Sequence, residues 1–347
     1  MKKVIGMDLG DKQHVVVVFS EEGEELETRS VGNAQRQVER LSERYPEAVV
    51  VMEAGTHSAW ISRLLKSRGH EVLVGNPRKL RAIWDSDDKS DERDARILGL
   101  MYRLEPRLLH GVVHRGEQAQ LDLTVIKARL QLVACRSKLI AHVRSVAKGF
   151  GYRLPSSSAE AFGKRALAHL PESLMTAMTP VLETIQTLNQ KIGRQDDQIE
   201  KLGQERYPES TRLQQVPGVG RLTALAYVLT LEDPSRFADS RAVGPFLGLT
   251  PRRDQSGDTD RQLPITKAGN PYLRQLLVNC AHYILGPFGP DCDLRRYGRR
   301  IAARGGKNAK KRAIVAVARK LAVLLHRLWA DGAVYQPIKD KVEQRAA

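Results

Sequence analysis

The sequence has few aromatic residues, few cysteines and no long apolar run, and each shortage excludes a class of protein. Phe, Trp and Tyr make up 5% of the 347 residues, too few for base stacking to be the main means of binding a single strand. The cysteines, Cys135, Cys280 and Cys292, are too far apart to suggest a disulfide framework or a zinc site. No apolar run approaches membrane-spanning length, and the amino terminus turns acidic before a signal peptide forms. We therefore expect a soluble protein of a reducing cytoplasm, with no membrane partner.

The net charge of +16 is concentrated toward the carboxyl end. Residues 1–110 hold 18 Lys and Arg against 19 Asp and Glu, whereas residues 251–347 hold 20 against 8. Eleven basic residues and no acidic one lie between Arg295 and Lys320. This block runs into the apolar-periodic stretch from Ala313 to Trp329, which favours a folded helix over a disordered tail. We expect it to bind a polyanion, DNA or RNA, mainly through charge.

The first third of the chain alternates between strand-like and helix-like segments. Three strand-like segments come first, and the later run Ala48–Glu53 is continuously apolar up to its last residue, as a buried central strand requires. The order strand, strand, strand, helix, strand, helix, strand, helix predicts an α/β layer of the ribonuclease-H-like type. The expected strands are 3–8, 14–19, 27–31, 48–53 and 71–74, and the expected helices are 34–44 and 58–67.

Two long helices are expected in the middle of the chain. Apolar residues recur at helical spacing from Glu117 to Lys148, and a Pro/Ser-rich break follows at 154–158. Thr179-Pro180 predicts the start of the second helix, because proline is tolerated in a first turn. Apolar residues fill the heptad positions of this helix, as expected either for an intramolecular helical hairpin or for a dimerising coiled coil. Those positions are Val181, Ile185, Leu188, Ile192, Ile199 and Leu202.

We therefore expect three parts: an α/β domain with a long terminal helix at 1–150, a helical or coiled-coil dimerisation segment at 151–206, and a mainly helical, basic domain at 207–347. The last part opens with Val216-Pro-Gly-Val-Gly220, followed by a helical segment. A short glycine-rich turn that opens a helix presents backbone N–H groups to a phosphate, as helix-hairpin-helix segments do. The pentapeptide alone is weak evidence, because Pro-Gly turns are common.

Four acidic residues stand where their expected elements would bring them together. Asp8 and Glu53 end strands, and Asp91 and Asp94 share one face of an expected helix because three residues separate them. Carboxylates of this kind suit magnesium, and two such ions stabilise the attacking and leaving oxygens of a phosphoryl transfer. Taken singly, Asp8 also fits a turn and Asp91 or Asp94 a helix cap, whereas Glu53 would be expensive to bury unpaired at the end of its apolar run. Neighbouring acids that remain alternative ligands are Asp11, Asp85, Asp87, Asp88 and Glu92.

The motifs together resemble those of the insertion-sequence one-ten family of transposases. The first domain of that family is matched by Asp8-Leu-Gly, Val51-Met-Glu-Ala54 and Lys89-Ser-Asp-Glu-Arg-Asp-Ala95. The resemblance covers nearly the whole chain, and the joint order of the motifs is more specific than any one of them. Ser90 stands where the family usually has threonine. The second domain is matched by Val216-Pro-Gly-Val-Gly220, Leu247-Gly-Leu-Thr-Pro251, Ser256-Gly257 and Ile265-Thr-Lys-Ala-Gly-Asn270.

This resemblance implies a first domain with a fold like that of RuvC-type Holliday-junction resolvases, with Asp8, Glu53, Asp91 and Asp94 as metal ligands. It also implies that Ser256 is the nucleophile. A serine that attacks a phosphodiester stores the bond energy in a phosphoserine, so a second strand needs no external energy source for rejoining. From the residues alone, Ser256-Gly257 is read more simply as a turn in the polar loop 252–261.

Basic residues near the serine and in the basic block are candidate phosphate ligands. Three arginines flank the serine, two basic residues follow the loop, and four more lie in the block. These candidates are Arg252, Arg253, Arg261, Lys267, Arg274, Arg299, Arg300, Lys310 and Lys311.

We accordingly predict a magnesium-dependent DNA recombinase that acts on double-stranded donor and target DNA. It would work as a homo-oligomer, a dimer or tetramer, with its active site assembled in cis or in trans, in the bacterial cytoplasm and at the nucleoid. The family resemblance also implies a noncoding bridge RNA as a guide, and a basic surface that reads shape while base pairing reads sequence is consistent with one.

Two other functions remain open at this stage. A RuvC-like structure-specific endonuclease would use the carboxylates to activate water, and its products would be open nicks without attached protein. A non-enzymatic nucleic-acid-binding protein would keep the acids for structure, and would be indifferent to Asp8→Asn.

Overall fold

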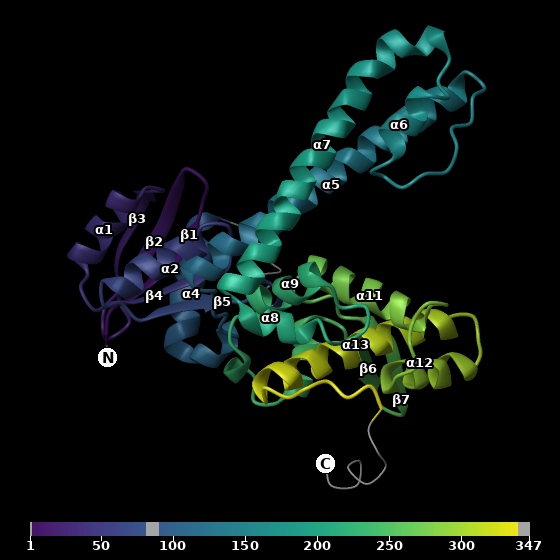
Figure 1. Ribbon diagram of the computed structural model, residues 1–347. Helices are drawn as coiled ribbons and strands as arrows, with labels where there is room; N and C mark the ends of the chain where they lie inside the picture. The colour runs from purple at the N-terminus through teal and green to yellow at the C-terminus, as the bar shows by residue number, and fades with distance from the viewer. Residues whose placement is uncertain (1, 81–89, 339–347) are drawn as a thin grey trace. The chain divides into compact units, whose positions relative to one another are not determined.

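The computed structural model describes residues 2–80 and 90–338. The chain divides into two compact units, Met1–Arg115 and Gly116–Ala347, whose elements are labelled in Figure 1. Asp85, Asp87 and Asp88 lie outside the described residues. Among the described residues, no helix has both the length and the apolar character needed to cross a membrane. The expected functional divisions at residues 150 and 206 stay predictions.

The first unit is built on a five-stranded sheet in the order β3-β2-β1-β4-β5. The strands β1 (Val4–Leu9), β2 (Gln13–Phe19) and β3 (Glu25–Gly32) form an antiparallel meander. The strands β4 (Val49–Glu53) and β5 (Val72–Gly75) extend it from β1 in parallel. The predicted three-strand meander and the buried strand that follows it are therefore confirmed. They could be predicted because the pattern of apolar residues is strong in this part of the sequence.

Helices cover both faces of this sheet. Successive side chains along a strand point to opposite faces, so each strand contributes residues to the packing on both. On one face, Ile5 and Met7 of β1 pack with residues of α1 (Gln35–Arg44) and α2 (Ser58–Ser67). On the other face, Val4 of β1 and Val49 and Val51 of β4 pack with α3 (Pro77–Leu80), α4 (Asp91–Leu104) and the short helix η1 (Pro106–Leu109). The strands β1, β2 and β4 are therefore buried on both sides, whereas the edge strand β3 is largely exposed.

The second unit begins with two long antiparallel helices, α5 (Glu117–Gly149) and α7 (Glu172–Glu205), with α6 (Phe162–Leu167) packed beside α7 (Figure 1). The predicted first helix is thereby confirmed. The apolar stripe of α7 packs on α5 of the same chain. Polar contacts flank it, since Arg129 donates to Asp196 at 2.6 Å and Arg136 donates to Asn189 at 2.7 Å. These contacts form the intramolecular hairpin, and the dimerising coiled coil stays a prediction.

The expected start of α7 at Thr179 is wrong, because the helix begins at Glu172 and contains Pro180. A proline inside a helix removes one backbone donor. The hydroxyl of Thr179 donates to the Met175 carbonyl oxygen at 2.8 Å. Leu174 and Met178, which precede the proline, are buried in a cluster with the residues of α6. This burial offsets the lost hydrogen bond and extends the helix by seven residues beyond the expected start.

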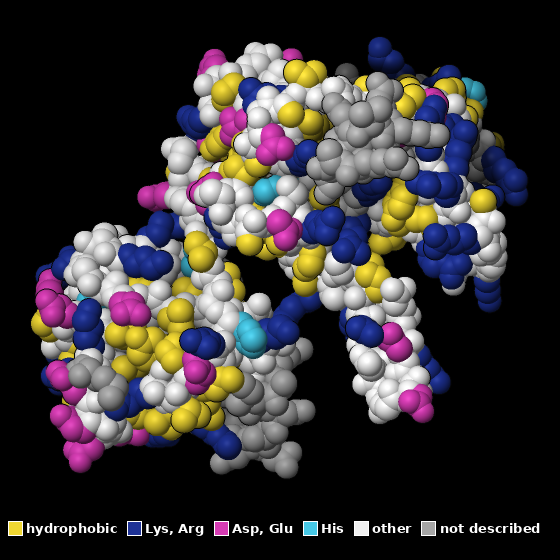
Figure 2. All heavy atoms as spheres, turned by 90° about the horizontal axis from the view of Figure 1, so that it is seen from below, with side chains coloured by type: hydrophobic (Ala, Val, Ile, Leu, Met, Phe, Trp, Pro, Cys, Tyr) yellow, Lys and Arg dark blue, Asp and Glu magenta, His cyan; other side chains and the backbone are white. Residues whose placement is uncertain are grey.

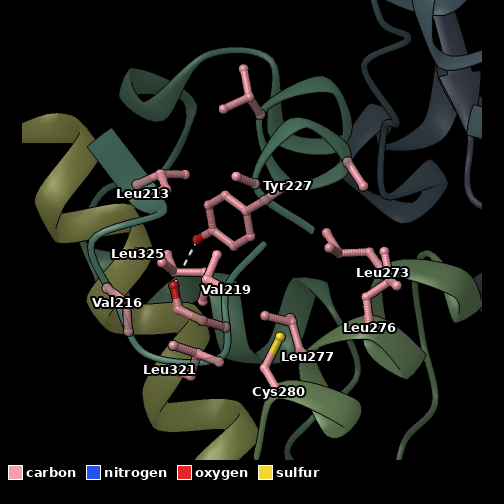
Figure 3. Packing of buried hydrophobic residues seen from close by; sticks show 14 of the residues in the cluster. Leu213, Val216, Val219, Tyr227, Leu273, Leu276, Leu277, Cys280, Leu321 and Leu325 are labelled. Atoms are coloured by element: carbon pink, nitrogen blue, oxygen red, sulfur yellow. Dashed lines mark hydrogen bonds between the residues drawn. The ribbon is translucent and has the colours of Figure 1, made fainter. Parts of the chain in front are cut away.

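The rest of the second unit is mainly helical, as predicted, and has one large apolar core. Tyr227 is completely buried there, and its hydroxyl donates to the Ala322 carbonyl oxygen at 2.6 Å; Figure 3 shows it among Leu213, Leu277 and Leu325. The basic block of the sequence is folded into helices. The helices are α8 (Pro208–Leu213), α9 (Arg221–Leu231), η2 (Pro234–Arg236), η3 (Ser240–Ala242), α10 (Val243–Phe246), α11 (Pro271–Leu285), α12 (Asp293–Ala303) and α13 (Ala309–Ala330).

Candidate active site

Asp8 and Glu53 occupy neighbouring positions on the face of the sheet that α4 covers. Met7 of β1 is the register partner of Met52 of β4, so the residues that follow them lie side by side on adjacent parallel strands. Side chains alternate along a strand, and Val49 and Val51 face α4. By this alternation Glu53 of β4 lies on the same face as Val49 and Val51, and Asp8 of β1 lies on the same face as Val4. Two strands of the central sheet therefore direct a carboxylate to the same place.

The first turn of α4 brings two more carboxylates to this edge. Ser90 caps the helix, because its hydroxyl oxygen accepts a hydrogen bond from the Arg93 backbone N–H at 3.2 Å. Asp91 and Asp94 then lie in the first turn, as the sequence predicted. A Cβ added to Gly6 of β1 would stand only 1.9 Å from the Ala95 carbonyl oxygen. The helix start is therefore pressed against the end of β1, two residues from Asp8.

The pKa of Asp8 is raised to about 6, partly by the neighbouring acids. Burial raises this pKa most, the charges of Asp91 and Asp94 raise it further, and the charge of Glu53 has a smaller effect. The other three predicted acids are therefore close enough to Asp8 to act on its carboxyl group. Four negative charges held together on rigid elements repel one another, and a divalent cation would relieve that repulsion.

Within residues 2–80 and 90–338, no three acidic, histidine or cysteine side chains converge into a ready metal cage. Magnesium does not need one, since it is usually held by one or two carboxylates, several waters and substrate phosphate. The donor set, four hard carboxylates, fits this ion. Among the alternative ligands, Glu92 pairs with Arg96 at 2.7 Å, and the exposed Asp11 approaches His57 at 3.4 Å.

Two histidines near this end of the first unit were not anticipated. His14 of β2 is buried and its ring centroid lies 6.2 Å from that of His57. Burial, followed by the charge of His57, lowers the pKa of His14. A single histidine in an apolar strand gives no sequence signal, because it is usually a core residue. His14 shares the α1/α2 face with Val16 and Val18, which is the face opposite Asp8.

The expected polar loop at 252–261 is instead a β-hairpin. Strand β6 (Pro251–Ser256) pairs with β7 (Thr259–Ile265), and Ser256 stands directly opposite Thr259. Gly257 turns the chain with a φ of +53°, which glycine adopts without strain. The strands were not predicted because their residues are polar and exposed, so no apolar alternation marks them. Ser256 is consequently the last strand residue at an exposed hairpin tip.

The hairpin separates the three arginines that flank the serine. Residues opposite one another share a face, so Ser256, Thr259 and the pair Asp254–Arg261 lie on one face. Arg253 lies on the other face, where Asp260 binds it through two hydrogen bonds of 2.8 Å. Arg252 sits at a register shift. Arg261 is therefore the arginine that the strand alternation clearly places beside the serine.

The remaining basic candidates occupy different settings. Arg274 braces a loop, since it donates to the carbonyl oxygens of Leu247 at 3.0 Å and Ala268 at 2.6 Å. Lys267 lies in that loop with a left-handed φ of +55°. The other four are exposed on helices: Arg299 and Arg300 on α12, and Lys310 and Lys311 on α13.

The glycine-rich turn Val216-Pro-Gly-Val-Gly220 lies between α8 and α9, and the helix-hairpin-helix motif stays a prediction. Val216 and Val219 are buried in the core, and Gly218 has a φ of +82°. A Cβ at Gly218 would stand 2.8 Å from the Tyr283 ring, so packing as well as backbone conformation requires glycine here. Phosphate binding by this turn stays a prediction.

Comparison with known proteins bears directly on the family. Residues 5–151 match the IS110-type DEDD family described as "Transposase", and residues 210–291 match the family described as "Transposase IS116/IS110/IS902 family". The chain is 27% identical to the transposase for insertion sequence element IS1111A of Coxiella burnetii over 336 residues, which cover 94% of this chain and 89% of that protein.

Two further relatives agree. A probable family 20 transposase of Pseudomonas aeruginosa is 28% identical over 346 residues, 96% of this chain and 98% of its own length. The transposase for insertion sequence element IS1328 of Yersinia enterocolitica is 27% identical over 285 residues, 80% of this chain and 82% of its own. The two matched families, taken with relatives that span most of the chain, confirm the predicted resemblance. The chain therefore belongs to the IS116/IS110/IS902 family of insertion-sequence transposases, enzymes that cut and recombine DNA.

Proposed function

We propose that this transposase cuts DNA with the Ser256 hydroxyl, assisted by magnesium bound to Asp8, Glu53, Asp91 and Asp94, and rejoins the strands after exchange. The observation that carries the proposal is the raised pKa of Asp8, because it arises in part from acids on two other elements. A carboxyl group with a perturbed pKa beside other acids at one edge of a sheet is characteristic of a catalytic site.

The sheet order supports a ribonuclease-H-like, RuvC-like fold for the first unit. Three antiparallel strands followed by two parallel ones, in the order β3-β2-β1-β4-β5, with helices on both faces, is the arrangement expected for that fold. In it, Asp8 stands on the central strand and Glu53 on its parallel neighbour.

The carboxylates would hold the metal and the serine would do the covalent chemistry. A bound magnesium ion supplies charge that lowers the cost of forming an alkoxide and stabilises a leaving oxygen. The Ser256 oxygen forms a bond to phosphorus while one phosphate ester bond to the DNA breaks, and the departing strand oxygen leaves as a hydroxyl. In rejoining, a hydroxyl of another strand attacks the same phosphorus and releases the serine. Each step exchanges one phosphate ester for another, so no external energy source is required.

Arg261 would bind the non-bridging oxygens of that phosphate, because it shares a hairpin face with the serine. The exposed basic residues of α12 and α13 would bind further along the nucleic acid. The bridge RNA rests on the family resemblance, and the net charge of +16 is compatible with binding both nucleic acids.

A Ser256→Ala variant tests the nucleophile. It should bind DNA normally but form no covalent protein–DNA adduct on a denaturing gel. Thr259→Ala is the matched control, because that hydroxyl stands directly opposite on the hairpin, and this variant should still form the adduct. Adduct formation by Ser256→Ala would refute the assignment. Open nicks without adduct from the unaltered protein would favour a metal-activated-water nuclease.

A complementation experiment tests whether the protein acts as the proposed dimer or tetramer with its active site shared between protomers. Chains carrying Ser256→Ala are mixed with chains carrying Asp8→Asn. Adduct formation by the mixture, absent from each variant alone, would show that different protomers supply the serine and the carboxylates.

A further inference from the structure

The second unit has a groove that the proposed chemistry does not use. It encloses about 1120 Å³ and is formed by α12, α13 and the base of the β6–β7 hairpin, together with Arg241 of η3. Binding sites for small molecules usually measure roughly 300–1,000 Å³. This groove is larger, and it is lined by several separate elements. It is therefore suited to a segment of a polymer.

The charge of the groove has one sign. Six of its lining side chains are basic and none is acidic, and none of the six has a carboxylate partner among the described residues. By contrast, Arg253, Arg296 and Arg327 elsewhere in the unit pair with aspartates. Such uncompensated cations favour a polyanion. The six are Arg241, Arg304, Lys311, Arg312, Arg319 and Lys320.

The floor of the groove is apolar. Leu263 and Ile265 of β7, Ile301 of α12, and Val315 and Val323 of α13 all line it. Figure 2 shows yellow apolar side chains surrounded by dark blue Lys and Arg at the right of the view, the side on which Figure 1 places α12 and the hairpin. A groove with this floor can contact apolar surface of a bound ligand as well as neutralise the negative charge of that ligand.

We propose that this groove binds an unpaired DNA strand, with phosphates against the basic rim and base faces against the aliphatic floor. A duplex hides its base faces and would leave the floor uncovered, whereas an unpaired strand offers both surfaces. Tyr297 is the only aromatic side chain in the lining, so affinity rests mainly on charge, as the low aromatic content indicates. The proposal rests on the proposed function, since an enzyme that exchanges strands must hold one while it is unpaired.

The position of the groove supports this occupant. Residues 262–265 of β7 form one wall, and their strand pairs with β6, which ends at Ser256. Ser256 lies roughly 17 Å along the hairpin from Pro251, at about 3.4 Å per residue. A strand held at the base of the hairpin would therefore be directed along the element that carries the nucleophile.

Two exposed lysines provide a matched test of the rim. Lys311 of α13 lines the groove, whereas Lys138 of α5 is likewise exposed and does not line it. Binding of fluorescent oligothymidylate to the full chain is measured by anisotropy at several salt concentrations. Lys311→Ala should weaken binding several-fold and reduce the salt slope by about 0.7, whereas Lys138→Ala should change neither. Equal losses in the two variants would overturn the proposal, because total charge alone would explain them.

The floor is tested with a leucine pair. Leu263 is 36% exposed in the groove, and Leu121 is 55% exposed on α5. Leu263→Asp should reduce oligothymidylate affinity at least tenfold, and Leu121→Asp should not, with thermal unfolding used to verify that both variants fold. Duplex DNA binding should be less affected by Leu263→Asp. A duplex as sensitive as the single strand, or oligouridylate bound more tightly and lost more completely in Lys311→Ala, would overturn the assignment to an unpaired DNA strand.

Binding requires no cleavage, so the outcomes of the two proposals separate. If Lys311→Ala loses strand binding while Ser256→Ala still forms adducts, the groove stands and the serine mechanism fails. If Ser256→Ala forms no adduct while Lys311→Ala and Lys138→Ala bind strands equally, the mechanism stands and the groove fails.

Discussion

Gly6 of β1 lies directly against the Ala95 carbonyl oxygen of α4, at a separation that leaves no room for a side chain. A second glycine continues the contact, because a Cβ at Gly99 would stand 2.4 Å from the Phe19 ring. Two glycines thus allow the helix to rest on the strands. Since Asp91 and Asp94 begin this helix and Asp8 follows Gly6 in the strand, the backbone contact fixes the spacing of the carboxylates.

Gly6→Ala should therefore destabilise the protein and displace the carboxylates. Its methyl group would force α4 away from β1, at a cost of about 1–3 kcal/mol, measured as a lower urea midpoint. Gly55→Ala is the control, because a Cβ there meets nothing within 4 Å. Equal stability of Gly6→Ala and the unaltered protein would show that α4 does not rest on β1 in this way.

The pKa of Asp8 predicts how stability depends on pH in the absence of divalent cations. Its folded value of about 6 lies above the ordinary value of 3.8, so the folded protein binds a proton more tightly than the unfolded chain. Stability from this group is present at pH below about 4 and is lost as pH rises through 6. At pH 7, Asp8→Asn should therefore raise the free energy of unfolding by on the order of 1 kcal/mol after allowing for solvent screening. Its melting temperature should be correspondingly higher.

The difference in stability between Asp8→Asn and the unaltered protein should vanish below about pH 3, where the acid is protonated in both the folded and the unfolded state. Thermal unfolding across this pH range, with a chelator present, measures it. A constant difference at all pH values would mean that the effect of Asp8→Asn arises from packing and not from charge.

The sequence predicts the first unit well because physical signals there are local. Apolar runs mark β1, β2 and β4, and Ser90 followed by an acid-rich turn marks the start of α4. The convergence of Asp8 with Asp91 could be expected only after the strand order was assumed. The contact between Gly6 and Ala95 that brings these acids together joins residues about 90 positions apart in the sequence. No local sequence pattern predicts such a contact.

The structure of the second unit is harder to predict from the sequence, because its helix bounds, its hairpin and its groove depend on tertiary packing. Pro180 indicates a helix start, but burial of Leu174 and Met178 moves that start to Glu172. The residues of the hairpin that carries Ser256 are polar and exposed up to Leu263, so they lack the apolar alternation of a strand. The groove draws its lining from residues between Arg241 and Val323, and only the folded chain brings them together.

Magnesium should stabilise the protein through the carboxylates of α4. A ligand that binds only the folded state adds about 2.7 kcal/mol at a hundredfold excess over its Kd. Asp91→Asn and Asp94→Asn should lose this rise in melting temperature. Glu92→Gln should keep it, because Glu92 is in the same helical turn but pairs with Arg96. If Glu92→Gln abolished the response, the metal would be bound by a different set of acids.

Arg261 and Arg253 should differ in their effect on the cleavage rate. Arg261 shares the hairpin face of Ser256, whereas Arg253 lies on the opposite face in a bidentate pair with Asp260. Removing a single donor that stabilises developing charge in a transition state costs about 10²–10³-fold in rate. Arg261→Ala should therefore slow adduct formation by roughly that factor with DNA binding nearly unchanged, and Arg253→Ala should slow it severalfold at most. Single-turnover adduct formation at saturating DNA separates the two, and a larger loss in Arg253→Ala would reverse the assignment of faces.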